Sequence, residues 1–311
     1  MSWFLAAIIA YLTLAIVNLL DKFLVTSILR DSKSYAFIAC VLGSLVFVAA
    51  PWFVFWPGWP LLFLNLLNGA IFALALWFLY EALLRGEASR ILVLVGGMTP
   101  LFSLVFSVLF LKEQFTNNQW LGMSLILVGV FVIALLPVSR SYLARVFHKL
   151  KLFQEFKPGG LRIALLSSLA YSLYFMSTKQ AYLFQPFASA FIWTRLGAAL
   201  FVLLFLIDKN SRQTIIRTFH RSSPGKHKFL VIVNQGFGSL GFVLQNYAIF
   251  LGSVVLVNAL QGIQYAFLLI ISALLAVMAP KLLKETFSWR ILVQKIAAVA
   301  VIAVGLYFIA I

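Results

Sequence analysis

The sequence predicts an all-α polytopic membrane protein with ten transmembrane helices, arranged as two inverted-topology repeats of five helices each. Three observations carry this prediction: the apolar composition, ten apolar segments of membrane-spanning length, and similar phrases in the same order in both halves. Hydrophobic residues make up 63% of the 311 residues and charged residues only 10%. Soluble domains lie nearer half and a quarter, so this chain needs lipid as its solvent.

Each of the ten segments has the length of a transmembrane helix. About 20 residues cross the ~30 Å hydrocarbon layer as a helix, and the segments lack the short alternating pattern of barrel strands. The first is taken as a span and not as a cleavable signal, because no Lys or Arg precedes it and no cleavage site follows. The segments cover 2–20, 35–55, 61–83, 89–111, 119–137, 161–184, 187–207, 228–251, 253–279 and 288–311.

The basic residues predict the orientation of the chain. The net charge is +16, and the first, third, fifth, seventh and ninth loops hold 20 of the 24 Lys and Arg residues. The positive-inside rule places such loops in the cytoplasm, which puts both termini on the other side. The location would be the inner (plasma) membrane in a bacterium or archaeon. The charge is then an orientation signal and a contact with lipid headgroups, and nucleic-acid binding is not expected.

The two halves of the chain repeat one another. The segments 36–48 (AFIACVLGSLVFV) and 190–202 (AFIWTRLGAALFV) agree at seven of thirteen positions without a gap. LKEQF at 111–115 is echoed by LKETF at 283–287, ALLRGEA at 82–88 by AIFLGSV at 248–254, and AYLTL at 10–14 by AYSLY at 170–174. We therefore divide the chain into a first repeat (1–137), a basic cytoplasmic linker (138–160) and a second repeat (161–311).

The number of spans in each repeat fixes how the second copy crosses the membrane. Five is odd, so the second copy must cross in the opposite sense, as in many secondary transporters. The two Lys-Glu-x-Phe phrases then end the fourth helix of each repeat on opposite membrane faces. Within the linker, residues 143–153 fit either a short interfacial helix or a solvated basic segment.

This pattern resembles the EamA-type transporters of the drug/metabolite transporter (DMT) superfamily. The resemblance lies in two five-helix units, a fourth helix reading ASRILVLVGGMTPLFSLVFSVLFLKEQF and a fifth containing LGMSLILVGVFVIA. It implies a central cavity between the repeats and transport of small organic solutes. Members often carry an arginine in the second helix of a repeat. Here the second repeat has Arg195, while the first has Val41 at the matching position.

Arg195 is also the leading site candidate on physical grounds. It lies about nine residues into its span, near mid-membrane. An arginine at that depth costs ~2.5–3.5 kcal/mol on insertion scales, so such residues usually face a cavity or a partner. It either lines a solute path or bonds internally to helix carbonyls or Glu81. The excess of positive over negative charges within the spans favours an anionic or carboxylate-bearing solute.

Other polar side chains in the spans form stripes that face either a cavity or neighbouring helices. Their spacing places several on common helix faces, and Asn68 and Asn234 occupy matching positions in the two repeats. The predicted substrate-binding residues, besides Arg195, are Asn18, Asn68, Trp77, Tyr80, Glu81, Tyr171, Tyr174, Asn234, Asn258, Gln261 and Tyr265.

Two helices are expected to be interrupted near mid-membrane. Pro100 removes a backbone hydrogen bond and Gly96-Gly97 relaxes the preceding turn. Gly262 occupies the matching region of the second repeat. Freed carbonyl groups at corresponding places in two repeats indicate a binding site, although kinks also serve packing alone.

Several classes of function are disfavoured by missing motifs. Cys40 is the one cysteine, and the three histidines fall in basic loops without ligand spacing, so no metal site or other cofactor is expected. A membrane enzyme would need acid–base or metal-binding clusters, and an ATP-driven pump would need a phosphate-binding loop. We expect a secondary transporter of a small metabolite, in contact with membrane lipid, with a flippase of lipid or lipid-linked substrates as the alternative. No carboxylate stands clearly at mid-depth to couple transport to an ion.

Overall fold

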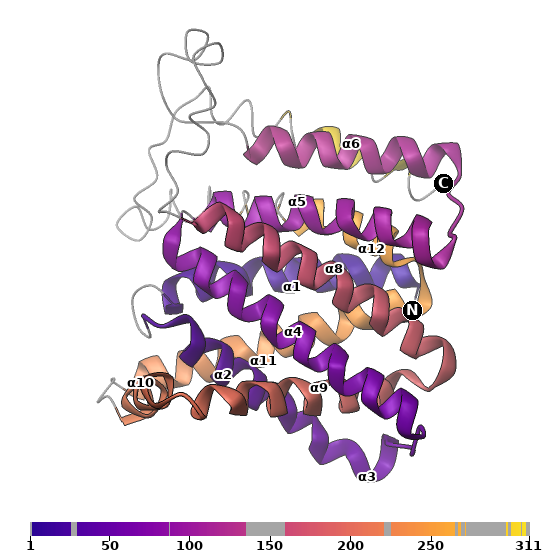
Figure 1. The fold of residues 1–311 in the computed structure, drawn as a ribbon. Coiled ribbons are helices and arrows are strands. Elements are labelled where there is room, and N and C mark those ends of the chain that lie inside the picture. Colours follow the sequence, from indigo (N-terminus) through magenta and orange to yellow (C-terminus); the bar gives the residue numbers. More distant parts are fainter. Residues whose placement is uncertain are drawn as a thin grey trace, which may run out of the picture.

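In the computed structural model, the described part of the chain folds into a bundle of helices without strands (Figure 1). It comprises residues 2–25, 30–86, 88–134, 159–220 and 225–264, with short helical pieces at 267–268, 271, 297, 300–305 and 307–308. The possible interfacial helix at 143–153, the second Lys-Glu-x-Phe phrase and Tyr265 lie outside these residues.

The helices of the first half follow the expected apolar segments closely. Polar caps set two of the starts: the Ser2 hydroxyl accepts a hydrogen bond from the Leu5 amide, and the Asp31 carboxylate accepts one from the Ser34 amide. The elements are α1 (Trp3–Phe23), α2 (Ser32–Gly43) with a 3-10 turn (Ser44–Ala49), α3 (Ala50–Phe53), α4 (Trp59–Arg85), α5 (Ala88–Phe106) with a π turn (Ser107–Leu111), and α6 (Asn117–Ala134).

In the second half, the structure describes helices in the segments expected at 161–184, 187–207 and 228–251 and at the start of 253–279, together with an additional helix, while most of 265–311 lies outside the described residues. These helices are α8 (Gly160–Phe184), α9 (Phe187–Leu203) with a 3-10 turn (Leu204–Leu206), α10 (Lys209–His220), α11 (Gly225–Leu251) and α12 (Val254–Ala259). The segment containing α10 was expected to be only a loop. Its sequence, KNSRQTIIRTFH, is polar and basic with Ile215 buried and most other side chains exposed, so α10 packs on the bundle through one apolar face.

Four helices in the described residues are long and apolar enough to cross a membrane by length and composition: Trp3–Asp21, Ser32–Phe53, Trp59–Arg85 and Phe187–Leu206. Large apolar side chains on them point outward, including Phe63 at 70% exposure and Trp59 at 75%. An outer surface of this kind suits lipid and not water. The chain is therefore an integral membrane protein.

The two ends of the bundle differ. The start of α1 lies at one end, together with α3, and α10 lies at the opposite end (Figure 1). Inside the bundle, α1 packs along α11 and α4 packs along α8 and α9. Each of these contacts joins the first half of the chain to the second, so the core is built between the halves.

The crossing of α4 and α9 brings two backbones into direct contact. A Cβ added to Gly69 would stand 2.7 Å from the carbonyl carbon of Gly197, and one added to Gly197 would stand 2.6 Å from the Leu66 Cα. Only glycine at both positions permits this approach, which is how small residues act at many membrane helix interfaces.

The structure gives α5 as one helix through the predicted interruption. The helix continues through Gly96, Gly97 and Pro100, and the irregular turn comes later, at Ser107–Leu111. A helix in a packed bundle tolerates one missing backbone bond when its neighbours hold it in place. In the second half, α12 ends at Ala259 and a turn at Leu260 precedes Gly262.

Substituting Gly69 with alanine should destabilise the fold, because the new methyl group meets backbone atoms that cannot move aside. Overpacking of this kind typically costs about 1–3 kcal/mol, and we expect a lower melting temperature in detergent. The matched control is Gly236→Ala on α11, where a Cβ would meet nothing within 4 Å. Equal melting temperatures for the two variants would contradict the close crossing.

Candidate functional site

Arg195 lies at the centre of the bundle, enclosed by aromatic rings. Its guanidinium carbon is 4.3 Å from the ring centroid of Phe72 on α4, 4.7 Å from that of Phe191 on α9 and 4.3 Å from that of Phe242 on α11. The residue is 7% exposed. Cation–π contacts in desolvated surroundings contribute roughly 2 kcal/mol or more, so the rings offset much of the cost of burying the charge.

The Arg195 guanidinium keeps unused hydrogen-bonding capacity. Its Nη2 atom is buried and has no hydrogen-bond partner among the described residues. Glu81, which could have neutralised it, pairs instead with Arg85 at 2.6 Å. A buried donor without an acceptor is costly, so this atom is the strongest indication of a ligand-binding position in the described interior.

Tyrosines of α8 complete the surroundings of Arg195. The rings of Tyr171 and Tyr174 contact Phe72 at centroid distances of 6.3 and 5.2 Å. The Tyr174 hydroxyl donates a 2.9 Å hydrogen bond to Asn246 Oδ1 on α11, so its orientation is fixed. On the α2 side, a Cβ on Gly43 would stand 3.9 Å from Arg195 Nη1. We call Arg195 with Phe72, Phe191 and Phe242 the arginine cage.

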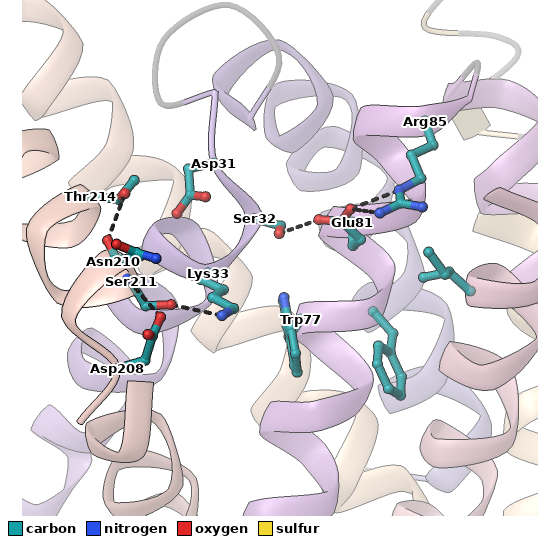
Figure 2. A pocket seen from close by; sticks show the side chains of 12 residues that line it. Asp31, Ser32, Lys33, Trp77, Glu81, Arg85, Asp208, Asn210, Ser211 and Thr214 are labelled. Atoms are coloured by element: carbon teal, nitrogen blue, oxygen red, sulfur yellow. Dashed lines mark hydrogen bonds and ion pairs between the residues drawn. The ribbon is translucent and has the colours of Figure 1, made fainter. Parts of the chain in front are cut away.

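A pocket of about 470 Å³ opens at the end of the bundle where α10 lies (Figure 2). Its walls come from the start of α2, the end of α4, the start of α8 and the start of α10. The lining residues are Asp31, Ser32, Lys33, Trp77, Phe78, Glu81, Arg85, Ile163, Asp208, Asn210, Ser211 and Thr214. Trp77 and Glu81 were predicted from the sequence, whereas the α10 side was not.

Most acidic groups of the pocket already have local roles. Asp31 accepts a 2.7 Å bond from the Ser34 amide, and Asp208 accepts a 2.9 Å bond from the Ser211 amide, so both cap helices. The hydrogen bonds from Ser211 lower the pKa of the exposed Asp208 carboxyl group. Glu81 accepts bonds from Ser32 and Arg85.

Lys33 is the cation nearest the aromatic floor of the pocket. Its ammonium nitrogen donates a 2.7 Å hydrogen bond to the Ser211 hydroxyl, as Figure 2 shows. The same nitrogen lies 5.5 Å from the Trp77 ring centroid and 5.9 Å from that of Phe205. An anionic group entering the pocket would meet this cation before it reached the bundle interior.

The opposite end of the bundle is closed by contacts between the two halves. Asn65 on α4 and Gln185 after α8 exchange two amide hydrogen bonds, of 3.1 and 3.0 Å. Nearby, the Ser189 hydroxyl bonds both the amide and the carbonyl of Phe55, at 3.2 Å each. Asn65 is fully buried and Gln185 is 9% exposed, so these contacts form a seal.

The first Lys-Glu-x-Phe phrase contributes to the same closed end. The Glu113 carboxylate accepts hydrogen bonds from Ser107 at 2.8 Å and from Ser253, at the start of α12, at 2.7 Å. Lys179 of α8 donates to three backbone carbonyls at the end of α11, those of Ile249, Phe250 and Gly252. Glu113 therefore fastens helices together and has a structural role here.

Asn234 and Tyr80 belong to a second buried cluster, formed around Asp21. Asn234 Nδ2 donates a 2.7 Å hydrogen bond to Asp21 Oδ1, and the Tyr35 hydroxyl donates to the same oxygen. The Tyr80 ring packs against Tyr35 with a centroid distance of 4.4 Å and ring planes tilted by 43°. Asp21 is 5% exposed, so its carboxyl group is buried among the helices near the end of α1.

The predicted polar stripe of the ninth segment mainly bonds between helices. Asn258 Nδ2 donates a 3.0 Å bond to Ser103 on α5, whose hydroxyl lies 3.1 Å from that of Ser172 on α8. Asn258 Oδ1 and Gln261 Oε1 are buried without partners in the described part of the chain. The amide groups of this stripe therefore join helices through some of their atoms, while two of their oxygen atoms remain without a described hydrogen-bond donor.

The remaining predicted residues lie apart from the arginine cage. Asn68 Oδ1 accepts a 2.5 Å bond from Ser177, and Asn68 Nδ2 is buried without a described partner. Asn18 is half-buried on α1. The predicted substrate-binding residues thus lie in several separate places. The arginine cage, with Tyr171 and Tyr174 beside it, is the place where a charged group and aromatic rings come together.

Sequence reasoning missed the phenylalanines of the cage, Asp21 with Tyr35, and the α10 side of the pocket. Phenylalanine is too common in this chain, at 31 residues, for any one to stand out. Asp21 is the one carboxylate within the first twenty-five residues. A single acidic residue in a long apolar segment could have indicated a buried polar cluster.

Comparison with known proteins finds a family model that matches the first part of the chain. Residues 1–135 match the model of the EamA-like transporter family, and no curated protein matches the chain. One solved structure, described only as the crystal structure of a protein, aligns with a TM-score of 0.61 at 18% identity and covers 98% of this chain and 94% of its own. At that identity the likeness concerns the fold alone.

The match covers α1 to α6, which together form the first unit of the bundle. This part of the chain is therefore similar to the EamA-like transporter family, which belongs to the drug/metabolite transporter superfamily.

Proposed function

We propose that the protein is a secondary transporter of small organic solutes that carry a carboxylate or other anionic group, with Arg195 as the residue that binds this group. The observation that carries the proposal is the buried Arg195 Nη2, which lacks an acceptor among the described residues. Members of the EamA-like family are transporters, which agrees with this class of function.

The position of Arg195 suits a site that both halves of the chain share. The cage takes Phe72 from the first half and Phe191 and Phe242 from the second. The rings surround the guanidinium group, so a carboxylate would bind the N–H groups at its edge, where charge-assisted hydrogen bonds are strong.

An inverted repeat accounts for the pairing of the helices. In the numbering of the two repeats, α1 and α8 are the first helices and α4 and α11 the third. The first helix of each unit packs along the third helix of the other, since α1 packs on α11 and α4 on α8. A two-fold relation between the units produces this reciprocal arrangement, and it favours alternating access between them.

The two ends of the bundle would then be the two gates. The α10 end has the open pocket, and its loops carry most of the basic residues, so we assign it to the cytoplasm by the positive-inside rule. The end with the Asn65–Gln185 pair is closed. This conformation therefore corresponds to a state in which the cytoplasmic end is open as far as the pocket and the arginine cage is enclosed.

The pocket and the arginine cage both draw residues from α4. Trp77 lines the pocket and Phe72 contacts Arg195. Five residues of helix separate them, which is about 7.5 Å along α4. A solute in the pocket would therefore reach Arg195 only after the helices or side chains that enclose the cage had moved.

Transport by the purified protein in liposomes tests the proposal. We expect saturable exchange of at least one labelled compound from a panel of amino acids and organic anions. Arg195→Ala should raise the half-saturating concentration about 10- to 100-fold, because a hydrogen bond to a charged group contributes roughly 1.5–3 kcal/mol. The matched control, Arg162→Ala, removes an exposed arginine at the start of α8 and should behave as wild type.

Other outcomes of the same assay would contradict the proposal. Movement of labelled lipids alone would favour a flippase, and flux that does not saturate would favour a channel. Normal exchange by Arg195→Ala would show that Arg195 does not bind the solute, although the protein would still be a transporter.

Cysteine labelling tests the assignment of the two gates. In a Cys40→Ala background, Ile163→Cys places a thiol in the pocket wall and Asn65→Cys places one in the closed end. We expect a water-soluble maleimide to label the first quickly and the second slowly, and to reach Ile163→Cys from the cytoplasmic face of oriented vesicles. Equal labelling of both thiols, or labelling of Ile163→Cys from the other face, would contradict the assignment.

A further inference from the structure

The cluster around Asp21 places a carboxyl group in the interior without a cation. Asp21 Oδ1 accepts hydrogen bonds from the Tyr35 hydroxyl and from Asn234 Nδ2, the latter at 2.7 Å. Both donors are neutral, and Asp21 forms no ion pair with a described Lys or Arg. A buried carboxylate in such surroundings binds a proton more readily than one in water, because burial disfavours its charge.

The groups that face Asp21 from the neighbouring helices are also neutral at ordinary pH. They are Tyr35 from α2, Tyr80 from α4, Tyr171 from α8, and Asn234 and Gln235 from α11. These residues come from both halves of the chain. The protonation state of Asp21 therefore affects the hydrogen bonds that join α1 and α2 to α11. Alternating access would have to change this contact between the two halves.

The other carboxylates in the described residues have different partners. Asp31 and Asp208 cap helices near water, Glu81 pairs with Arg85, and Glu113 accepts hydrogen bonds from two serines. Asp21 is thus the described carboxylate that combines burial with the absence of a helix-capping or ion-pairing role.

We propose that Asp21 is a proton-binding site that couples solute transport to proton movement. The inference rests on the proposed function. When Asp21 takes a proton from water at an open gate, its oxygen becomes a weaker acceptor for Tyr35 and Asn234, and the new O–H needs an acceptor. Asn234 Oδ1, which is buried without a described partner, supplies it after rotation of the amide group. One proton thus exchanges one set of α1–α11 contacts for another.

The position of the cluster gives protons a route from the pocket. Tyr35 follows the pocket residues Ser32 and Lys33 by less than one turn, and Tyr80 precedes Glu81. Ser32 thus lines the pocket and Tyr35, three residues later on α2, donates to Asp21, so the two hydroxyl groups are candidate steps for a proton between the pocket and Asp21. The sequence alone offered little support for coupling through a carboxylate, because burial of Asp21 was not foreseen.

Carbon-13 NMR of the aspartate carboxyl groups tests the site without any solute. The chain has three aspartates, Asp21, Asp31 and Asp208, so three signals are expected, and Asp21→Asn and Asp31→Asn assign them. We expect the Asp21 signal to remain that of a protonated carboxyl group at a pH where the other two have ionised. If Asp21→Asn does not fold, Tyr35→Phe assigns the signal by shifting it. Ionisation of all three together would overturn the proposal.

A pH gradient across proteoliposomes tests the coupling. We expect a gradient to drive accumulation of whichever compound of the labelled panel the wild-type protein exchanges, and Asp21→Asn to exchange it without responding to the gradient. Exchange by wild type that ignores the gradient would overturn the coupling and leave the transporter proposal standing. If no compound of the panel moves, the transporter proposal fails, and the carboxyl titration still decides whether Asp21 binds a proton.

Discussion

The interior of this protein is organised around a buried guanidinium group that has no carboxylate partner in the described chain. Placing Arg195 at mid-membrane costs ~2.5–3.5 kcal/mol on insertion scales, and Phe72, Phe191 and Phe242 return a comparable amount through contacts with its charge. Those rings come from α4, α9 and α11, so the charge is tolerated only when these three helices meet.

The close crossing of α4 and α9 is what makes that meeting possible. Gly69 lies three residues before Phe72, and Gly197 lies two residues after Arg195. The contact between the two glycine backbones therefore fixes the cage within one helical turn. At the matching position of the first repeat, Gly43 faces the Arg195 side chain and not another backbone. The single arginine breaks the similarity of the two repeats at the point where a solute would bind.

The fold was more predictable from the sequence than the site. Apolar segments bounded by charges and caps gave the limits of α4, α8 and α9 to within a few residues, because lipid imposes both length and composition. Arg195 stood out for the same reason, since an unpaired charge in lipid is rare. The helix α10 was missed because its few apolar residues do not form a long run.

The partners of the site residues could not be predicted, because they depend on packing between distant segments. Nothing in the sequence sets Phe242 apart from 30 other phenylalanines, and the pairing of Asp21 with Asn234 joins residues 213 positions apart. Glu81 is a second example. It was a possible partner of Arg195 from the sequence, but in the structure it bonds to Arg85 on its own helix and to Ser32 on α2.

Binding of an anionic solute at Arg195 is the central claim, and a thermal-shift comparison of wild type with Arg195→Lys tests it most directly. A ligand that binds only the folded protein raises its melting temperature. Lysine keeps the charge but loses the planar set of donors. We predict that at least one carboxylate-bearing compound raises the melting temperature of wild type and has little effect on Arg195→Lys, while its uncharged amide affects neither. Equal stabilisation of both proteins by the carboxylate compound would contradict the claim.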